Sequence, residues 1–257
     1  MELINIAQVF SLKPNEVHVW LFKLDPLTQA CLPWEQLLSA EEAARSKGYQ
    51  FDQDQLRFMA RRGILRQLLC RYTGLDPAGI TYLTGLYGKL SLPFHPLSFN
   101  LSFSQNWIAF VFTLNKDVGI DIEQVRPLPD LSHLVECWFS PEEQAGLSAL
   151  NPAEQLEAFY HIWTQKEAFI KAHGEGLSRP LKDFLVSVDP NMPGKLIYIR
   201  DDSNEASHWK MASFNLETGW RLAVCVRAES EQEICFYIPE QADFVSSVTS
   251  KKTSLFV

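Results

Sequence analysis

The stretch FNLSFSQNWIAFV at 99–111 decides the fold, because the chain repeats its pattern. A second copy, FNLETGWRLAVCV at 214–226, again joins FNL to a Trp that opens an apolar run. Each copy follows a long segment with helical spacing that ends in Gly-Leu, at 57–75 and at 154–177. The same order of elements thus occurs twice, which predicts two similar α+β halves. The alternative is a chance match of residues that are common in strands, since only short stretches match.

The repeat also predicts the division of the chain. Its 257 residues suffice for one large domain or two small ones. We expect two pseudo-symmetric lobes, 1–116 and 117–257, each with one long helix packed on a small antiparallel sheet. The cleft between two such lobes is the natural place for a ligand.

Composition and charge exclude several classes of protein. The 23 Lys and Arg against 31 Asp and Glu give a net charge of −8, which argues against a general nucleic-acid binder. The longest apolar run, at 107–114, has the length of a strand and not of a membrane span. No cation precedes Lys13, so no signal or transit peptide is expected. The cysteines lack CxxC spacing, which favours reduced thiols in a cytoplasmic protein: Cys31, Cys70, Cys137, Cys225 and Cys235.

Two acidic residues share one face of a predicted strand. The segment VGIDIEQV at 118–125 alternates, so that Ile120 and Ile122 point one way while Asp121 and Glu123 point the other. Same-face neighbours on a strand lie roughly 6.5–7 Å apart. Two anions at that spacing repel each other unless the face is solvated or a cation lies between them. The segment therefore fits either a hard cation such as Mg²⁺ or a solvated edge strand.

A third acid lies on the predicted helix that begins after Asn151 and ends near Gly174. Glu167 falls about 40° from Trp163, inside the apolar stripe of that helix. A carboxylate there is costly unless it is paired, protonated or bound to metal. Lys166 and Lys171 flank it, which favours a phosphate–metal site. The alternative is a surface pair of Glu167 and Lys171 at i,i+4 on a slightly rotated helix.

With these motifs in view, the chain resembles the larger, two-lobed (Sfp-like) class of 4′-phosphopantetheinyl transferases. It is similar to the Lys-Glu-Ala subgroup, which often serves fatty-acid, polyketide or glycolipid synthases. The matching segments are GIDIE at 119–123, WTQKEAFIK at 163–171, GEGL at 174–177, FNLSFS at 99–104, YGK at 87–89, and the helix arginines Arg57 and Arg66.

The resemblance implies an activity and a set of roles. The enzyme would transfer 4′-phosphopantetheine from coenzyme A to a serine of an apo acyl or peptidyl carrier protein, releasing adenosine 3′,5′-bisphosphate. Asp121, Glu123 and Glu167 would hold Mg²⁺ with the pyrophosphate of coenzyme A, and Asp121 would thereby take part in catalysis. Lys166 and Lys171 would contact the phosphates. Glu167, through Lys171 or a water, would accept the proton of the serine.

The resemblance also implies a nucleotide site and a docking groove. Arg57, Lys89 and Ser102 would hold the nucleotide end and its 3′-phosphate. Phe103 stands where the family often has a His that contacts this phosphate. Because a phenyl ring donates no hydrogen bond, that contact is lost or is supplied by Arg57 or a lysine. The segment 127–139 would border the carrier groove, and a monomer is expected because the second half can replace a partner subunit.

Two other functions suit the same residues. One is a Mg²⁺-dependent hydrolase of nucleotide pyrophosphates, in which water replaces the serine. The other is a non-catalytic carrier-binding protein that keeps the fold, against which the presence of all three acids argues.

Overall fold

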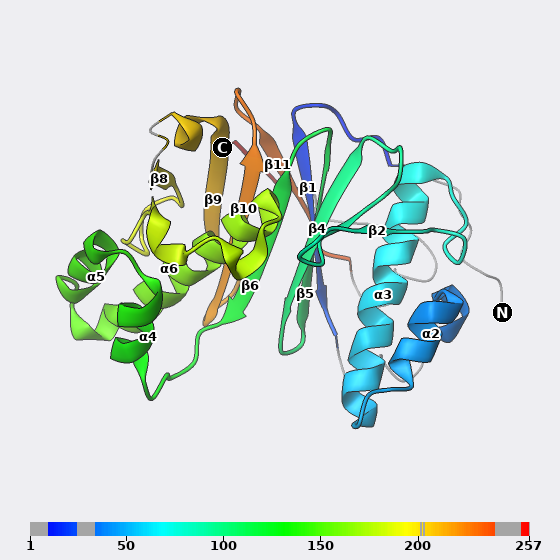
Figure 1. The fold of residues 1–257 in the computed structure, drawn as a ribbon, viewed down its shortest axis with the longest axis horizontal. Coiled ribbons are helices and arrows are strands. Elements are labelled where there is room, and N and C mark those ends of the chain that lie inside the picture. The colour runs from blue at the N-terminus through cyan, green and yellow to red at the C-terminus, as the bar shows by residue number, and fades with distance from the viewer. Residues whose placement is uncertain (1–9, 25–33, 201, 203, 240–252, 257) are drawn as a thin grey trace.

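Two helices of 22 residues dominate the computed structural model, which describes residues 10–24, 34–200, 202, 204–239 and 253–256 (Figure 1). These helices are α3 (Asp52–Thr73) and α6 (Pro152–His173). Each ends at a glycine with positive φ, 74° at Gly74 and 83° at Gly174, whose N–H bonds the carbonyl four residues earlier. Glycine adopts this left-handed conformation without the penalty of a Cβ, so both stops follow from the sequence.

The strands form two main sheets. The first has the order β12-β11-β1-β5-β4, and the second has the order β6-β10-β9. The bounds are β1 (Glu16–Lys23), β4 (Leu97–Ser104), β5 (Trp107–Leu114), β6 (Val118–Gln124), β9 (Trp209–Asn215), β10 (Trp220–Arg227), β11 (Glu233–Tyr237) and β12 (Thr253–Phe256).

Shorter elements complete the two halves. Two small hairpins pair β2 with β3 and β7 with β8. The strands of these hairpins are β2 (Leu83–Thr84), β3 (Leu90–Ser91), β7 (Phe184–Val186) and β8 (Leu196–Ile199). The shorter helices are α2 (Ala40–Ser46), α4 (Leu131–Trp138) and α5 (Pro141–Ser148). The 3₁₀ turns are η1 (Trp34–Leu37), η2 (Gly176–Ser178), η3 (Leu181–Asp183) and η4 (Glu205–His208).

The predicted repeat is present in the topology. In the first half, β1 pairs antiparallel with β5, which pairs with β4; in the second, β6 pairs antiparallel with β10, which pairs with β9. Each long helix lies between the first strand of its half and a small hairpin, and each half ends in its FNL hairpin. The predicted mixed α+β fold with two similar halves is confirmed.

The predicted division of the chain needs one correction. The junction at 116–117 lies in the turn between β5 and β6, as expected. However, β11 and β12, which were assigned to the second lobe, belong to the first sheet, where β11 runs parallel to β1 with Val17 opposite Ile234. One edge of β1 is covered by β5, and β11 satisfies the backbone groups of the other edge.

Three apolar cores hold these layers together. One lies between α3 and the first sheet, a second lies under α6, and a third joins the two sheets. In Figure 1, α6 lies over β6, β10 and β9, while α3 lies on the other side of the molecule beside β4 and β5. Ile120 and Ile122 are fully buried between the sheets, so the opposite face of β6 is turned toward α6.

Other sequence expectations concern thiols and membranes. Cys70, Cys137, Cys225 and Cys235 are free thiols, whereas Cys31 lies outside the described residues, as does the N-terminal segment 1–9. No helix in the described part of the chain combines the length and apolarity needed to cross a bilayer.

Candidate active site

The site begins with a close approach of β6 to α6 at Gly119. A Cβ at this position would overlap the carbonyl of Ala168 and the backbone nitrogen of Ala172, and it would lie 2.9 Å from the carbonyl carbon of Lys171. These are rigid backbone atoms of a helix, so only glycine fits. The contact fixes β6 against the last two turns of α6 and brings Asp121, two residues further along β6, close to Lys171.

Asp121 is a buried carboxylate with one satisfied and one unsatisfied oxygen. Its side chain is 3% exposed, and Oδ1 accepts hydrogen bonds from Ser102 Oγ at 2.8 Å and from Lys171 Nζ at 2.5 Å. Oδ2 is buried and has no hydrogen-bond partner. A buried carboxylate oxygen without a partner is costly, and a bound cation is one of the few groups that relieve that cost.

Glu123 and Glu167 share this cavity and add negative charge to it. Burial, followed by the charge of Asp121, raises the pKa of Glu123 to about 7, although Ser104 Oγ donates a hydrogen bond to Glu123 Oε2 at 2.8 Å. The pKa of Glu167 is raised by the same two causes, burial first. The raised pKa values of these two acids mean that, without a bound metal ion, the positive groups of the protein do not fully neutralise the three carboxylates.

The three acids line one cavity of about 340 Å³. The lining residues are Leu101, Ser102, Phe103, Asp121, Glu123, Trp163, Glu167 and Lys171. Carboxylates from a strand and a helix, with one oxygen unsatisfied, are the hard oxygen donors that Mg²⁺ takes, and water and phosphate oxygens would complete its shell. The residues present therefore fit this ion.

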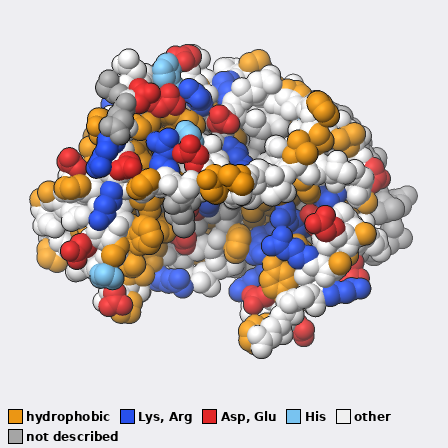
Figure 2. Space-filling view, viewed as in Figure 1, with side chains coloured by type: hydrophobic (Ala, Val, Ile, Leu, Met, Phe, Trp, Pro, Cys, Tyr) orange, Lys and Arg blue, Asp and Glu red, His pale blue; other side chains and the backbone are white. Residues whose placement is uncertain are grey.

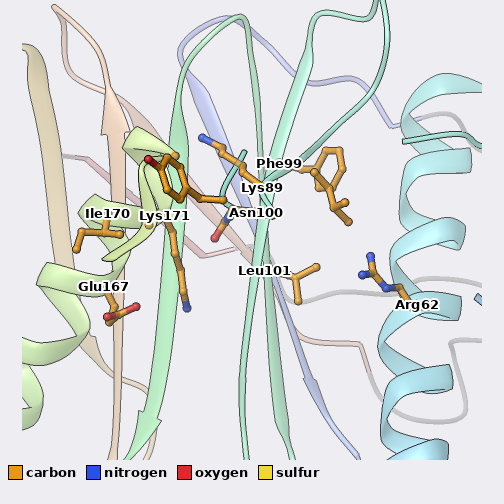
Figure 3. Close-up of a pocket in the computed structure, with 13 residues that line it drawn as sticks. Arg62, Lys89, Phe99, Asn100, Leu101, Glu167, Ile170 and Lys171 are labelled. Atoms are coloured by element: carbon orange, nitrogen blue, oxygen red, sulfur yellow. The ribbon is translucent and has the colours of Figure 1, made fainter. Parts of the chain in front are cut away.

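A second cavity, of about 310 Å³, adjoins the first and shares Leu101, Glu167 and Lys171 with it (Figure 3). Figure 3 shows Glu167 and Lys171 on the α6 side and Arg62 on the α3 side. Lys89 also lines this cavity, where its Nζ donates to Ala172 O at 2.5 Å and lies 3.8 Å from Asp117 Oδ1. Burial lowers the pKa of Lys89. The two cavities together suit an elongated anionic ligand.

Three residues predicted for the nucleotide end have different surroundings. Ser102 is buried between Lys171 and Asp121, and both of its hydrogen bonds belong to the acidic cluster. Phe103 is 48% exposed at the edge of that cavity. Arg57 lies on α3 with its guanidinium 3.8 Å from Asp54 Oδ1, and it is not among the residues lining either cavity.

Arg61 is a residue that the sequence reasoning missed. Its guanidinium lies 3.7 Å from the centre of the Phe103 ring, and no carboxylate of the described residues is within ion-pair distance of it. Burial lowers its pKa, and the nearby Arg57 and Arg62 lower it further. Figure 2 shows basic side chains gathered in a hollow of this face, between β5 and α3. The helical spacing of Arg57 and Arg61, one turn apart, was the available signal.

The prediction that Lys166 contacts phosphates is wrong. Lys166 is fully buried, with Nζ 2.8 Å from Glu143 Oε2 and hydrogen bonds to the carbonyls of Leu181 and Phe184 at 2.8 and 2.7 Å. Its side chain points toward α5 and β7 because that flank of α6 is covered by other elements and not by solvent. Lys166 thus joins these elements to α6 and is absent from both cavities.

Arg66, the second helix arginine of the resemblance, is also structural. It is 1% exposed, and its Nε lies 2.5 Å from Glu42 Oε2. Its Nη1 donates to the carbonyls of Pro77 and Ile80 at 2.5 and 2.9 Å. Arg66 therefore fastens the 77–80 segment to α3.

A different group of metal-type donors lies in the first sheet. The ligand atoms of Glu16, His18 and Cys235 lie within 4.8 Å of one another. Among the described residues, the carboxylate oxygens of Asp121, Glu123 and Glu167 are more widely spaced than this. Hydrogen bonds tie His18 into the sheet: Trp20 Nε1 donates to Tyr72 Oη at 2.8 Å, and Tyr72 Oη lies 2.7 Å from His18 Nδ1. His18 Nε2 lies 3.4 Å from Glu16 Oε2. We interpret this cluster as a structural network of the sheet.

Comparison with known proteins identifies the family. The family model described as the 4′-phosphopantetheinyl transferase superfamily matches residues 117–225, a segment that contains the three acids and Lys171. The 4′-phosphopantetheinyl transferase HetI of Nostoc sp. is 34% identical over 190 residues, which are 72% of this chain and 80% of that protein. The chain belongs to the 4′-phosphopantetheinyl transferase superfamily. The family expected from the sequence motifs is thus confirmed.

Other 4′-phosphopantetheinyl transferases match over a similar length. Sfp of Bacillus subtilis strain 168 is 32% identical over 189 residues, covering 73% of this chain and 81% of Sfp. The psf-1 transferase of Bacillus pumilus is 31% identical over 198 residues, covering 76% of this chain and 82% of that protein. These relatives favour a transferase over the nucleotide hydrolase and the non-catalytic binding protein.

Proposed function

We propose that this phosphopantetheinyl transferase moves 4′-phosphopantetheine from coenzyme A onto a serine of an apo acyl or peptidyl carrier protein and releases adenosine 3′,5′-bisphosphate. The observation that carries the proposal is the unsatisfied Oδ2 of Asp121, buried beside Glu123 and Glu167 where two cavities adjoin. A cation and a pyrophosphate would balance this cluster.

Asp121, Glu123 and Glu167 would hold Mg²⁺ together with the pyrophosphate of coenzyme A. When bound, Mg²⁺ neutralises charge on the pyrophosphate and on the departing bisphosphate. Glu123 must be ionised to bind the ion, although its pKa of about 7 in the metal-free protein leaves it partly protonated at neutral pH. Binding the ion therefore releases a proton from this site.

Lys171 would exchange one anion for another. In this structure its ammonium neutralises Asp121 Oδ1 at 2.5 Å. With a metal ion held by that carboxylate, the ammonium would be free to contact a phosphate oxygen from its position between the two cavities. Lys89 would add a second cation on the side of the adjoining cavity of about 310 Å³.

Glu167 would act as the base for the serine. In the reaction the serine oxygen forms a bond to the phosphorus that carries the pantetheine arm, and the bond from that phosphorus to the bridging pyrophosphate oxygen breaks. Glu167 takes the hydroxyl proton, and the electrons of the broken bond leave with the bisphosphate. Burial raises the pKa of Glu167 in the metal-free protein, and a bound cation would lower this pKa again, so that the carboxylate would be ionised and able to accept the proton. Phosphoryl transfer otherwise asks mainly for positioning and neutralisation of charge.

The nucleotide end would be held from the α3 side. Arg61, whose guanidinium lies over the Phe103 ring, would take over the 3′-phosphate contact that Phe103 itself does not make. Its guanidinium is partly desolvated and lacks a carboxylate partner among the described residues, so an anion would stabilise it. Arg62 lines the adjoining cavity, and Arg57 would add charge one turn earlier on α3.

The carrier protein would dock beside α4. The 127–139 segment includes this helix, and Trp138 is 38% exposed with its ring 6.5 Å from that of Trp163, which lines the acidic cavity. A carrier serine entering here would meet Glu167 directly. We further propose that the enzyme is a monomer, since both halves of the cleft come from one chain. The free thiols of the described residues support a cytoplasmic location.

A transfer assay tests the proposal. The protein is incubated with coenzyme A, Mg²⁺ and a small panel of apo carriers, and each carrier is weighed by mass spectrometry. We expect a gain of one phosphopantetheine group on the carrier serine. Release of adenosine 3′,5′-bisphosphate without a carrier, and without any gain of mass when one is present, would instead indicate the pyrophosphate hydrolase.

A further inference from the structure

The two lobes meet along β4 and β6, the edge strands of the two main sheets. The described sheets contain no backbone pairing between these strands. Side chains at every second position of β4 bridge them instead. Asn100 Oδ1 accepts from the N–H of Ile120 at 3.3 Å, Ser102 Oγ donates to Asp121 at 2.8 Å, and Ser104 Oγ donates to Glu123 at 2.8 Å. We call these three residues of β4 the inter-lobe seam.

The two serines of the seam are oriented in the same way. Ser104 Oγ accepts the N–H of Gln124 at 3.2 Å, which directs its own hydrogen to Glu123 Oε2. Ser102 Oγ accepts from Lys171 Nζ at 2.9 Å, which directs its hydrogen to Asp121 Oδ1. A hydroxyl that accepts from one fixed donor keeps a fixed direction for its single proton. Each serine therefore holds one oxygen of one acid.

We propose that Ser104 is a positioning residue that orients Glu123 for the metal ion, so that the seam sets the affinity of the metal site. This inference rests on the proposed function, because it takes Glu123 as a ligand of Mg²⁺. Ser104 occupies Oε2 of Glu123, so that Oε1 remains for a ligand in the cavity that Glu123 lines. Hydrogen bonds to a ligating carboxylate fix its direction, and their loss weakens metal binding by about 10-fold to 100-fold.

A merely structural role makes a different prediction. If Ser104 served only to satisfy the N–H of Gln124 at the edge of the sheet, its removal would lower stability and leave the metal site intact. The seam geometry favours the positioning role because Ser102 and Ser104, two residues apart, contact two acids that are likewise two residues apart on β6.

Mn²⁺ binding in the presence of coenzyme A separates the two roles. Mn²⁺ accepts the same oxygen ligands as Mg²⁺, and its free form is measured by electron paramagnetic resonance. We expect Ser104→Ala to weaken Mn²⁺ binding by about 10-fold or more. Ser104→Thr keeps the hydroxyl and should restore binding to within about 3-fold of the wild type. Ser98→Ala is the matched control, because Ser98 lies on the same face of β4 and makes no hydrogen bond to β6 among the described residues.

The outcomes are distinguishable. Unchanged Mn²⁺ binding in a folded Ser104→Ala variant overturns the positioning role and leaves the proposed transferase untouched. Failure of Ser104→Thr to restore binding overturns it as well. Wild-type protein that transfers phosphopantetheine without binding Mn²⁺ overturns both the metal site and this inference. If Ser104→Ala does not fold, Ser104→Cys, whose thiol is a weak donor of similar size, should show the same loss of affinity.

Discussion

Replacing Gly119 by alanine tests how the fold builds the site. A Cβ at this position would overlap two backbone atoms of α6 and lie 2.9 Å from a third, the carbonyl carbon of Lys171. To regain ordinary van der Waals separation, α6 must retreat from β6 by about 1 Å or more. Since β6 carries Asp121 while α6 carries Glu167 and Lys171, the retreat separates the acids and stretches the 2.5 Å contact of Lys171 with Asp121.

A misplacement of this size costs about 100-fold in the rate of a positioned reaction. Overpacking of a closely fitted interior also lowers the free energy of unfolding by about 1–3 kcal/mol. We therefore expect Gly119→Ala to remain folded, to unfold at lower urea concentration and to transfer phosphopantetheine about 100-fold more slowly. The assay measures kcat from carrier mass together with urea unfolding. Gly79→Ala is the control, because a Cβ there would meet its nearest atom at an ordinary 3.6 Å. Wild-type kcat in Gly119→Ala would show that the close contact of β6 with α6 does not position the acids.

Three further changes follow from the same structure. Arg61→Ala should raise KM for coenzyme A about 10-fold, as expected for the loss of a charge-assisted hydrogen bond of about 1.5 kcal/mol. The KM for 3′-dephospho-coenzyme A should stay constant, because this substrate lacks the phosphate. Equal effects on both substrates would contradict the 3′-phosphate contact. Because the pKa of Glu123 is raised to about 7, the metal-free folded state binds more protons than the unfolded state between about pH 4.5 and 7. The contribution of Glu123 to the free energy of unfolding should therefore fall as pH rises through that window, and Glu123→Gln should abolish this part of the pH dependence in urea titrations without metal. Lys166→Met leaves Glu143 buried without its cation, so it should lower the free energy of unfolding by about 3–5 kcal/mol. The KM for coenzyme A, measured on the folded fraction, should not change. A large rise in this KM would indicate that Lys166 does contact the phosphates.

Local patterns in the sequence predicted much of the site. The alternation along β6 correctly placed Ile120 and Ile122 on one face and Asp121 and Glu123 on the other; in the structure the isoleucines are buried and the acids line a cavity. The stop at Gly174 also follows from its sequence signal. These predictions succeeded because they depend on periods and caps, which are properties of neighbouring residues.

The remaining features depend on contacts between distant segments. The parallel pairing of β11 with β1 joins residues more than two hundred positions apart, and no local pattern encodes it. Lys166 was misplaced because α6 is covered on most sides, so that its angle on the helix does not tell which neighbour its side chain meets. The Arg61–Phe103 contact likewise requires α3 to lie beside β4.

The proposed function depends on Asp121, Glu123 and Glu167 holding one divalent ion together with a pyrophosphate. The most direct test is a crystal structure with coenzyme A and Mn²⁺, in which anomalous scattering locates the metal. We predict an ion that is bound by the pyrophosphate and by oxygens of these acids, with the unsatisfied Oδ2 of Asp121 among its ligands. An ion located elsewhere, or a pyrophosphate bound away from Asp121, would contradict it.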